Sequence, residues 1–384
     1  MSDFVFETTP KVLCEEGSSA RLGDMARTLG VRRALIVTDA GLVQAGLLDA
    51  VQDGFRAAGL ECTLFSDVQA DPPEGSVDAA VRAAREAGAD GVVGFGGGSS
   101  MDTAKLVALL AGTAQDLPAI YGIGLATGPR LPLIQVPTTA GTGSEVTPIA
   151  IVTTPSAEKK GVVSPLLYPD LAVLDARLTL GLPPHVTAMT GIDAMVHAIE
   201  AYTTRHKKNP VSDGLAVKAL ELLAANIRTV VAEPGNVAAR AAMLQGSLLA
   251  GMAFANAPVG AVHALAYPLG GHFHVPHGLS NALVLVPVLE FNRPAAEALY
   301  AELAPAVLPG RRFATPAEAA GAFIGAIRDL VAAMPMAQRL EEVGVTREDL
   351  PMLARDAMNV QRLLVNNPRE VTYDDALAIY AQVC

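Results

Sequence analysis

The stretch DGVVGFGGGSSMDTAK, residues 90–105, decides the fold class that we expect for this chain. It reads as a buried strand, three glycines and the start of a helix. Glycines such as Gly97 and Gly98 let the backbone approach a ligand, and the N–H groups of a helix start bind anions. We expect Ser99 and Ser100 to cap this helix, with Asp102 completing a box-like pattern. The stretch predicts a pyrophosphate site on an α/β sheet, and the alternative is a tight turn without a ligand.

Strand and helix patterns alternate from residue 33 to about residue 175. Alternation of this kind predicts right-handed crossovers and a mostly parallel sheet. The expected strands are residues 33–41 (ending in a turn), 61–67, 90–95, 132–139 and 171–179, and the expected helices are 47–59, 77–88 and 99–112. Residues 147–165 resemble a hairpin insert, and residues 4–17, outside the alternation, are expected to form a small hairpin.

The character of the sequence changes after residue 182. Residues 185–204, 212–231 and 236–255 show apolar side chains at helical spacing, and no convincing strand follows. We therefore expect an α/β domain over residues 1–182 and a helical domain over residues 183–384.

Composition and charge exclude several classes of protein. The net charge is −11, half of the residues are apolar, and no dense basic run occurs, which disfavours nucleic-acid binding. Three distant cysteines and a start without a signal-peptide pattern fit a reducing cytoplasm. Residues 241–288 carry no charged side chain, but their His, Asn, Gln and Pro content favours a buried helix pair over a membrane span.

A second polar loop, QVPTTAGTGSEVTP, follows a strand at residues 135–148. Ligands gather at this end of strands in α/β sheets. Thr138, Thr139, Thr142 and Ser144 are candidate donors to a diphosphate or a nicotinamide amide, and the alternative is an ordinary polar loop. Asp39 closes the strand ALIVTD, where a carboxylate could accept ribose hydroxyls and disfavour a 2′-phosphate.

Histidines concentrate in HALAYPLGGHFHVPH, residues 263–277, inside the uncharged run. A buried imidazole needs a partner, which is either a backbone carbonyl or a metal ion. Asp193 and His197 lie four residues apart on an expected helix and so share one face. A carboxylate with two or three imidazoles is a ligand set suited to Zn²⁺ or Fe²⁺.

Taken together, GGGSSMDTAK, PTTAGTGSEVT, GIDAMVHAIEAY, HALAYPLGGHFHVPHG and NNPREVT closely resemble motifs of the iron-containing (group III) metal-dependent alcohol dehydrogenase family. The resemblance covers almost the whole chain. It implies a Rossmann-like N-terminal domain, an all-helical C-terminal domain and an active site in the cleft between them. It also implies hydride transfer between NAD(H) and a small alcohol or aldehyde, with Fe²⁺ or alternatively Zn²⁺, in a homodimer or larger assembly.

The resemblance also implies roles for individual residues. The metal ligands fall on Asp193, His197, His263 and His277. The cofactor contacts fall on Asp39, Gly97, Gly98, Ser99, Asp102, Thr138, Thr139, Thr142, Ser144 and Lys160. Phe254 corresponds to an aromatic wall near the substrate.

Two positions depart from the family pattern. Tyr267 replaces a second histidine thought to assist proton transfer, so we expect the proton to pass through Tyr267, His272 or His274, with one of the two histidines favoured. VQADPP, residues 68–73, stands where many members have Asn-Pro, so Asp71 is expected to alter the adenine-side contacts.

Alternative functions remain open at this point. The same scaffold could act on a keto acid or a polyol, as maleylacetate reductases and glycerol dehydrogenases do, or as a lyase similar to dehydroquinate synthase. Few Arg and Lys residues occur around the motifs, which disfavours a multiply charged substrate. A nucleotide-binding protein without catalysis is the remaining class.

Overall fold

A six-stranded sheet, parallel throughout, forms the centre of the first unit, Glu7–Gly181. The structure is a computed structural model that describes residues 3–156 and 158–384. The strand order is β1-β9-β6-β4-β2-β3. The strands are β1 (Val12–Cys14), β2 (Arg33–Val37), β3 (Glu61–Phe65), β4 (Gly91–Gly96), β6 (Leu133–Pro137) and β9 (Leu171–Leu174). Central strands β4, β6 and β9 are buried on both faces, which explains their continuous apolar sequence.

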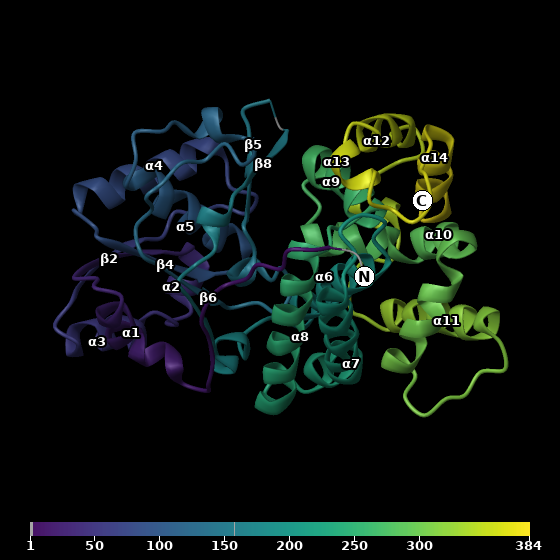
Figure 1. The fold of residues 1–384 in the computed structure, drawn as a ribbon, viewed down its shortest axis with the longest axis horizontal. Helices are drawn as coiled ribbons and strands as arrows, with labels where there is room; N and C mark the ends of the chain where they lie inside the picture. The colour runs from purple at the N-terminus through teal and green to yellow at the C-terminus, as the bar shows by residue number, and fades with distance from the viewer. Residues whose placement is uncertain (1–2, 157) are drawn as a thin grey trace. The chain divides into compact units, whose positions relative to one another are not determined.

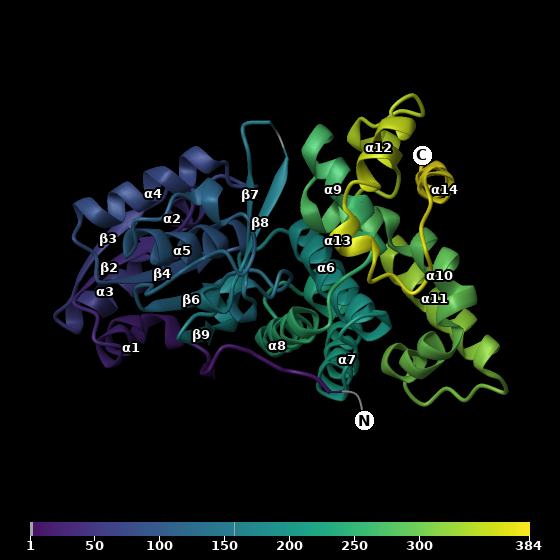
Figure 2. The ribbon, with the colours of Figure 1, turned by 45° about the horizontal axis from the view of Figure 1, so that its top comes forward.

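Helices cover both faces of this sheet, as Figure 2 shows. Leu106 and Val107 of α5 belong to the core on one face, with α4, and Phe55 of α3 belongs to the core on the other, with α1. The helices of this unit are α1 (Leu22–Thr28), α2 (Ala40–Gln44), α3 (Asp49–Ala57), α4 (Glu74–Glu86) and α5 (Gly98–Ala111). The expected α/β class is confirmed.

A second, three-stranded sheet contains β5 (Gly122–Ile123), β8 (Lys159–Val163) and β7 (Ile149–Thr153). Strands β7 and β8 form the expected antiparallel hairpin. The expected hairpin at residues 4–17 is wrong, because β1 pairs in parallel with β9, Val12 opposite Ala172. The edge of the large sheet satisfies the backbone groups of this segment, so a local turn is unnecessary.

The second unit, Leu182–Cys384 together with residues 3–6, is helical. Among its described residues no strand occurs. Its helices, seen in Figure 1, are α6 (Pro184–Thr203), α7 (Pro210–Ala232), α8 (Val237–Asn256), α9 (Ala261–Phe273), α10 (His277–Val307), α11 (Pro316–Ala332), α12 (Leu350–Ala357), α13 (Gln361–Leu364) and α14 (Tyr373–Gln382). The helices α6, α7 and α8 pack on one another, and α10 packs on α6, α9 and α11.

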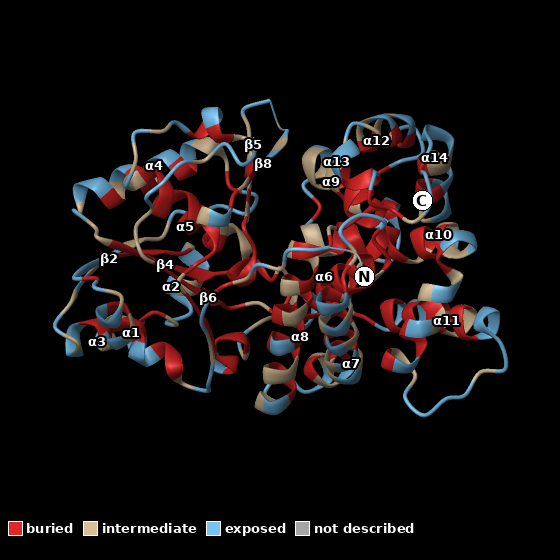
Figure 3. Cartoon of the chain, viewed as in Figure 1, coloured by how far each residue is buried: buried red, intermediate tan, exposed pale blue. Residues whose placement is uncertain are grey.

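The uncharged run 241–288 lies on three helices, α8, α9 and the start of α10, where the sequence predicted a pair. Figure 3 colours each residue by burial, and most residues of α6 are buried. By length and composition alone, α8 is the one helix of the described chain apolar enough to cross a membrane, and about half of its apolar window, 56%, is buried in the protein.

Candidate active site

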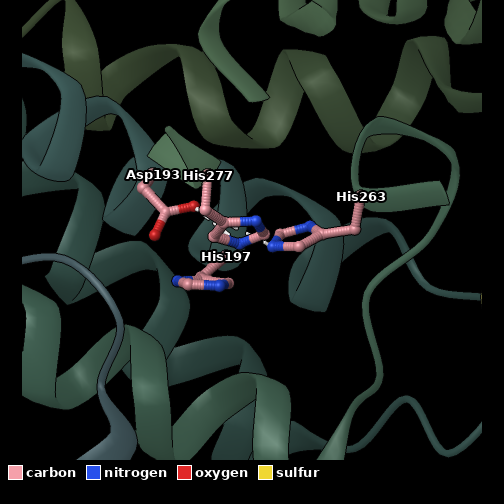
Figure 4. A group of neighbouring side chains, drawn as sticks. All are labelled: Asp193, His197, His263 and His277. Atoms are coloured by element: carbon pink, nitrogen blue, oxygen red, sulfur yellow. Dashed lines mark ion pairs between the residues drawn. The ribbon is translucent and has the colours of Figure 1, made fainter. Parts of the chain in front are cut away.

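Four side chains from three helices meet inside the helical unit. Asp193 and His197 come from α6, His263 from the start of α9, and His277 is the first residue of α10. One ligand atom of each lies within 4.8 Å of the others. Figure 4 shows the four side chains converging on one point. The structure thus brings together all four residues for which the sequence predicted a metal site.

Local sequence explains how these helices meet. Helix α9 ends at Phe273, its C-cap His274 has a left-handed φ of 53°, and α10 begins directly after Pro276. At Gly278 a Cβ atom would lie 2.5 Å from the Met189 carbonyl oxygen, so only glycine permits this approach of α10 to α6. The close contact places His277 beside Asp193, with 3.6 Å between Nε2 and Oδ1.

The donor set fits a divalent transition-metal ion. Asp193 is 2% exposed, and its carboxylate forms ion pairs with His263 and His277. Burial alone would raise the pKa of Asp193, but positive charge on His197, His277 and His263 and a hydrogen bond from Asn281 hold it below its ordinary value. An anionic carboxylate with three imidazole nitrogens matches Fe²⁺ and Zn²⁺ chemistry.

Two further residues hold the cluster in place. Glu200 lies on the same face of α6 and is 6% exposed; its Oε2 is 2.6 Å from His263 Nδ1, and its Oε1 accepts the Val262 N–H at 2.7 Å. This contact directs the other ring nitrogen of His263 toward the cluster. Asn281 donates to Asp193 Oδ1 at 2.6 Å.

These two residues were missed by the sequence reasoning, although a signal existed. Positions 193, 197 and 200 share one helical face, and Asn281 lies four residues after His277. Residue type alone did not separate Glu200 and Asn281 from other polar residues, so periodicity was the available clue.

Aromatic rings line two sides of the cluster. The Phe254 ring stacks on His197 at 4.3 Å between centroids. Tyr267 lies one turn after His263, with its ring centroid 6.2 Å from that of His277. The His277 side chain is 40% exposed, so the cluster opens on the side where Tyr267 lies.

The other two proton-transfer candidates have different surroundings. His272 is exposed, and its Nε2 is 2.6 Å from Asp356 Oδ2. His274 is exposed at the end of α9. Of the three candidates, Tyr267 is the one whose ring contacts a cluster residue in the described structure.

The glycine-rich loop lies in the first unit, between β4 and α5. Helix α5 begins at Gly98 without a side-chain cap, so the expected capping by Ser99 and Ser100 is wrong. The helix starts before both serines, and its first N–H groups lack intrahelical partners. Thr139 lies against Gly97, and Thr142 lies so close to Gly98 that a Cβ there would meet it at 2.9 Å. Thr138 donates its N–H to the Gly96 carbonyl.

Asp102 and Ser144 belong to a hydrogen-bond network with the buried Lys105. The Ser144 hydroxyl donates to Asp102 Oδ1 at 2.6 Å, and the fully buried Lys105 donates to Ser144 Oγ at 2.8 Å. Lys105 also donates to the carbonyl of Ile149. Burial lowers the pKa of Lys105, and Asp102 opposes this shift. The network ties α5 to the loop after β6, and the sequence reasoning did not identify Lys105.

The structure also shows the surroundings of Asp39, Lys160 and Ser99, which were expected to contact the cofactor. Asp39 caps α2 by accepting the Leu42 N–H at 3.1 Å. Lys160 is half-exposed and pairs with Glu158, whereas Lys159, on the opposite face of β8, pairs with Asp71 at 2.6 Å. Asp71 in turn donates its N–H to Ser99 Oγ at 3.2 Å. Lys159 and Asp71 are thus joined to the glycine-rich loop.

Comparison with known proteins matches both halves of the chain. The profile of "Iron-containing alcohol dehydrogenase" matches residues 9–176, and that of "Fe-containing alcohol dehydrogenase family, C-terminal" matches residues 187–384. The chain is 39% identical to a sulfoacetaldehyde reductase of Bilophila wadsworthia over 379 residues, covering 98% of each chain.

Solved structures agree with these matches over the entire length. A crystal structure of a 1,3-propanediol oxidoreductase has a TM-score of 0.96 at 35% identity, covering 100% of both chains. The sulfoacetaldehyde reductase of Bifidobacterium kashiwanohense, solved in complex with NAD⁺, has a TM-score of 0.90 at 30% identity, covering 100% of this chain and 99% of that one.

Proposed function

The chain belongs to the iron-containing alcohol dehydrogenase family, and from this premise we propose that it transfers hydride between NAD(H) and a small alcohol or aldehyde at the four-residue cluster. Its oxidoreductase class follows from the family. The observation that carries the proposed site is the convergence of Asp193, His197, His263 and His277 within 4.8 Å.

The metal site is proposed on these four residues, with Fe²⁺ as the family's ion and Zn²⁺ as an alternative. A bound divalent ion supplies positive charge that polarises a carbonyl and stabilises an alkoxide. Glu200 fixes the ring of His263, and Asn281 fixes the carboxylate of Asp193. Phe254 stacks on the ring of His197.

The NAD site is proposed on the first unit. The uncapped N–H groups at Gly98 and Ser99, together with Gly97, receive the pyrophosphate. Thr138, Thr139 and Thr142 supply polar contacts beside it, and Asp39 accepts ribose hydroxyls. Asp102 and Ser144 act by holding the loop, and Lys160 or its neighbour Lys159 reaches the cofactor.

The hydroxyl of Tyr267 is proposed as the group that contacts the reacting oxygen. It lies on the open side of the cluster, and Arg362 donates a hydrogen bond to its oxygen at 3.1 Å, which leaves its own proton available to a substrate. His272 contacts Asp356, and both His272 and His274 are exposed, so neither is proposed to contact the reacting oxygen.

We place the enzyme in the cytoplasm as a homodimer or larger assembly, without nucleic-acid or membrane partners. A net charge of −11 supports solubility and disfavours nucleic acid. The comparisons that name sulfoacetaldehyde and 1,3-propanediol as substrates of relatives suggest short aldehydes and diols.

The test is a screen of short alcohols, diols and aldehydes with NAD⁺ or NADH, with metal analysis on the same sample. We expect NAD-linked turnover that scales with Fe²⁺ or Zn²⁺ content. Absence of any absorbance change at every metal loading would overturn the proposal and favour a nucleotide-binding role without catalysis.

A further inference from the structure

Arg362 of α13 is brought to the open side of the cluster from 95 residues further along the chain than Tyr267. Its Nη2 donates to the Tyr267 hydroxyl, and its Cζ lies 5.7 Å from the centre of that ring. Tyr267 in turn lies beside His277, the most exposed member of the cluster. A guanidinium group therefore stands one side chain away from the proposed reacting oxygen.

The charge of Arg362 is not neutralised by the protein. No ion pair within residues 3–156 and 158–384 includes it, and the carboxylate of Asp356 on neighbouring α12 is bonded to His272. Arg369, later in the same segment, donates to the Phe291 carbonyl and lies over the Phe291 ring. Arg362 is exposed, and Tyr267 takes one of its five donors, so the remaining donors can meet a ligand.

We propose that Arg362 binds an anionic group, a sulfonate or a carboxylate, at the far end of a short aldehyde or alcohol whose oxygen lies at the cluster. This inference rests on the proposed function and narrows its substrate class. The planar guanidinium presents paired N–H donors that match the oxygens of such anions. A neutral substrate would leave the guanidinium to water.

The anionic group takes no part in the bond changes. In the reducing direction the carbonyl carbon gains a hydride from NADH, which becomes NAD⁺, and the carbonyl oxygen gains a proton. The sulfonate or carboxylate stays intact and only orients the substrate. A substrate without this group should therefore bind more weakly and be positioned less well.

The test compares matched substrates on the metal-loaded enzyme with NADH. Sulfoacetaldehyde is paired with propanal, and 4-oxobutanoate with butanal, and kcat/KM is measured for each. In Arg362→Gln we expect the ratio of anionic to neutral kcat/KM to fall about ten- to hundredfold, the size of one hydrogen bond to a charged group. Arg362→Lys should restore part of the ratio because it keeps the charge without the paired donors.

A matched control removes the same charge elsewhere. Arg355 is exposed on α12, and Arg355→Gln should leave the ratio within about twofold of wild type, since surface charges are screened by salt. If the ratio in Arg362→Gln falls only for the sulfoacetaldehyde pair, the anion is a sulfonate; if it falls only for the 4-oxobutanoate pair, the anion is a carboxylate.

Three results would overturn the inference. They are a wild-type enzyme that prefers the neutral partner of both pairs, an unchanged ratio in Arg362→Gln, and an equal fall in the Arg355→Gln control. Each presupposes turnover of at least one aldehyde. No NADH oxidation with any aldehyde at full metal loading would instead contradict the proposed function itself, and with it the inference.

Discussion

At the scale of single residues, sequence reasoning found the metal-ligand candidates and missed the residues that hold them. The four-residue spacing of Asp193 and His197 identified them as candidates. His263 and His277 were identified because histidines are concentrated in an uncharged run. Glu200 and Asn281 are ordinary polar residues whose role appears only when three helices meet. Arg362 gave no signal, because its proximity to Tyr267 is a long-range contact.

Glu200→Gln tests how far the cluster depends on an outer contact. The amide keeps the shape but cannot serve both His263 and the Val262 N–H as two carboxylate oxygens do. We expect the affinity for Zn²⁺ or Fe²⁺ to fall about 10–100-fold, as for outer partners of metal-bound histidines. Competition with a chelator measures the dissociation constant.

The control is Glu302→Gln, since Glu302 is exposed and accepts a hydrogen bond from Tyr202. Metal affinity should not change in that variant. Equal affinity in wild type and Glu200→Gln would show that His263 does not need this partner.

At the scale of helices and strands, periodicity predicted the elements well where their period was clear. The alternation up to residue 175 corresponds to observed strands and helices, and the expected hairpin of β7 and β8 is present. The error at residues 4–17 has a physical cause: β1 is a three-residue edge strand whose partner, β9, lies about 160 residues later. Short segments carry too little pattern to reveal such a partner.

Gly278→Ala tests the contact between α10 and α6. The added Cβ would lie 2.5 Å from the Met189 carbonyl oxygen, so α10 must shift and take His277 with it. We expect a loss of about 1–3 kcal/mol in the free energy of unfolding, the usual cost of overpacking, together with weaker metal binding. Denaturant unfolding of the metal-free protein and chelator competition measure the two effects.

Gly214→Ala is the matched control on α7. No atom lies within 4 Å of the Cβ position there, so alanine should be neutral or stabilising by up to about 1 kcal/mol. If Gly278→Ala behaves like this control, the close approach does not position His277.

At the scale of the whole molecule, the sequence indicated an α/β half and a helical half, and the structure contains both. The strand order and the network around Lys105 could not be predicted from the sequence, because both depend on contacts between residues far apart in the chain. That network joins residues 102, 105, 144 and 149, which come from one helix, one loop and one strand. Its buried polar atoms satisfy one another, so no local pattern marks them.

Glu145 gives the molecule a pH dependence that can be measured. It is 1% exposed, and burial raises its pKa to about 7, with nearby Lys105 opposing the shift. The folded state thus binds this proton more tightly than the unfolded state, so stability falls as the pH rises from about 4.5 to about 7. The contribution is at most about 3 kcal/mol.

Glu145→Gln removes this ionisation. Its thermal-unfolding midpoint should fall less between pH 5 and pH 8 than that of wild type, in about that window. Parallel profiles for the two proteins would show that Glu145 does not ionise on unfolding in this range.

We propose above all that the cluster of Asp193, His197, His263 and His277 binds the ion on which NAD-linked turnover depends. The most direct measurement titrates Fe²⁺ or Zn²⁺ into metal-free wild type and His263→Ala while NADH oxidation by a reactive aldehyde is followed. Activity should saturate at one ion per wild-type chain, and His263→Ala should lose both tight metal binding and turnover. Unchanged metal content and hydride transfer in His263→Ala would contradict it.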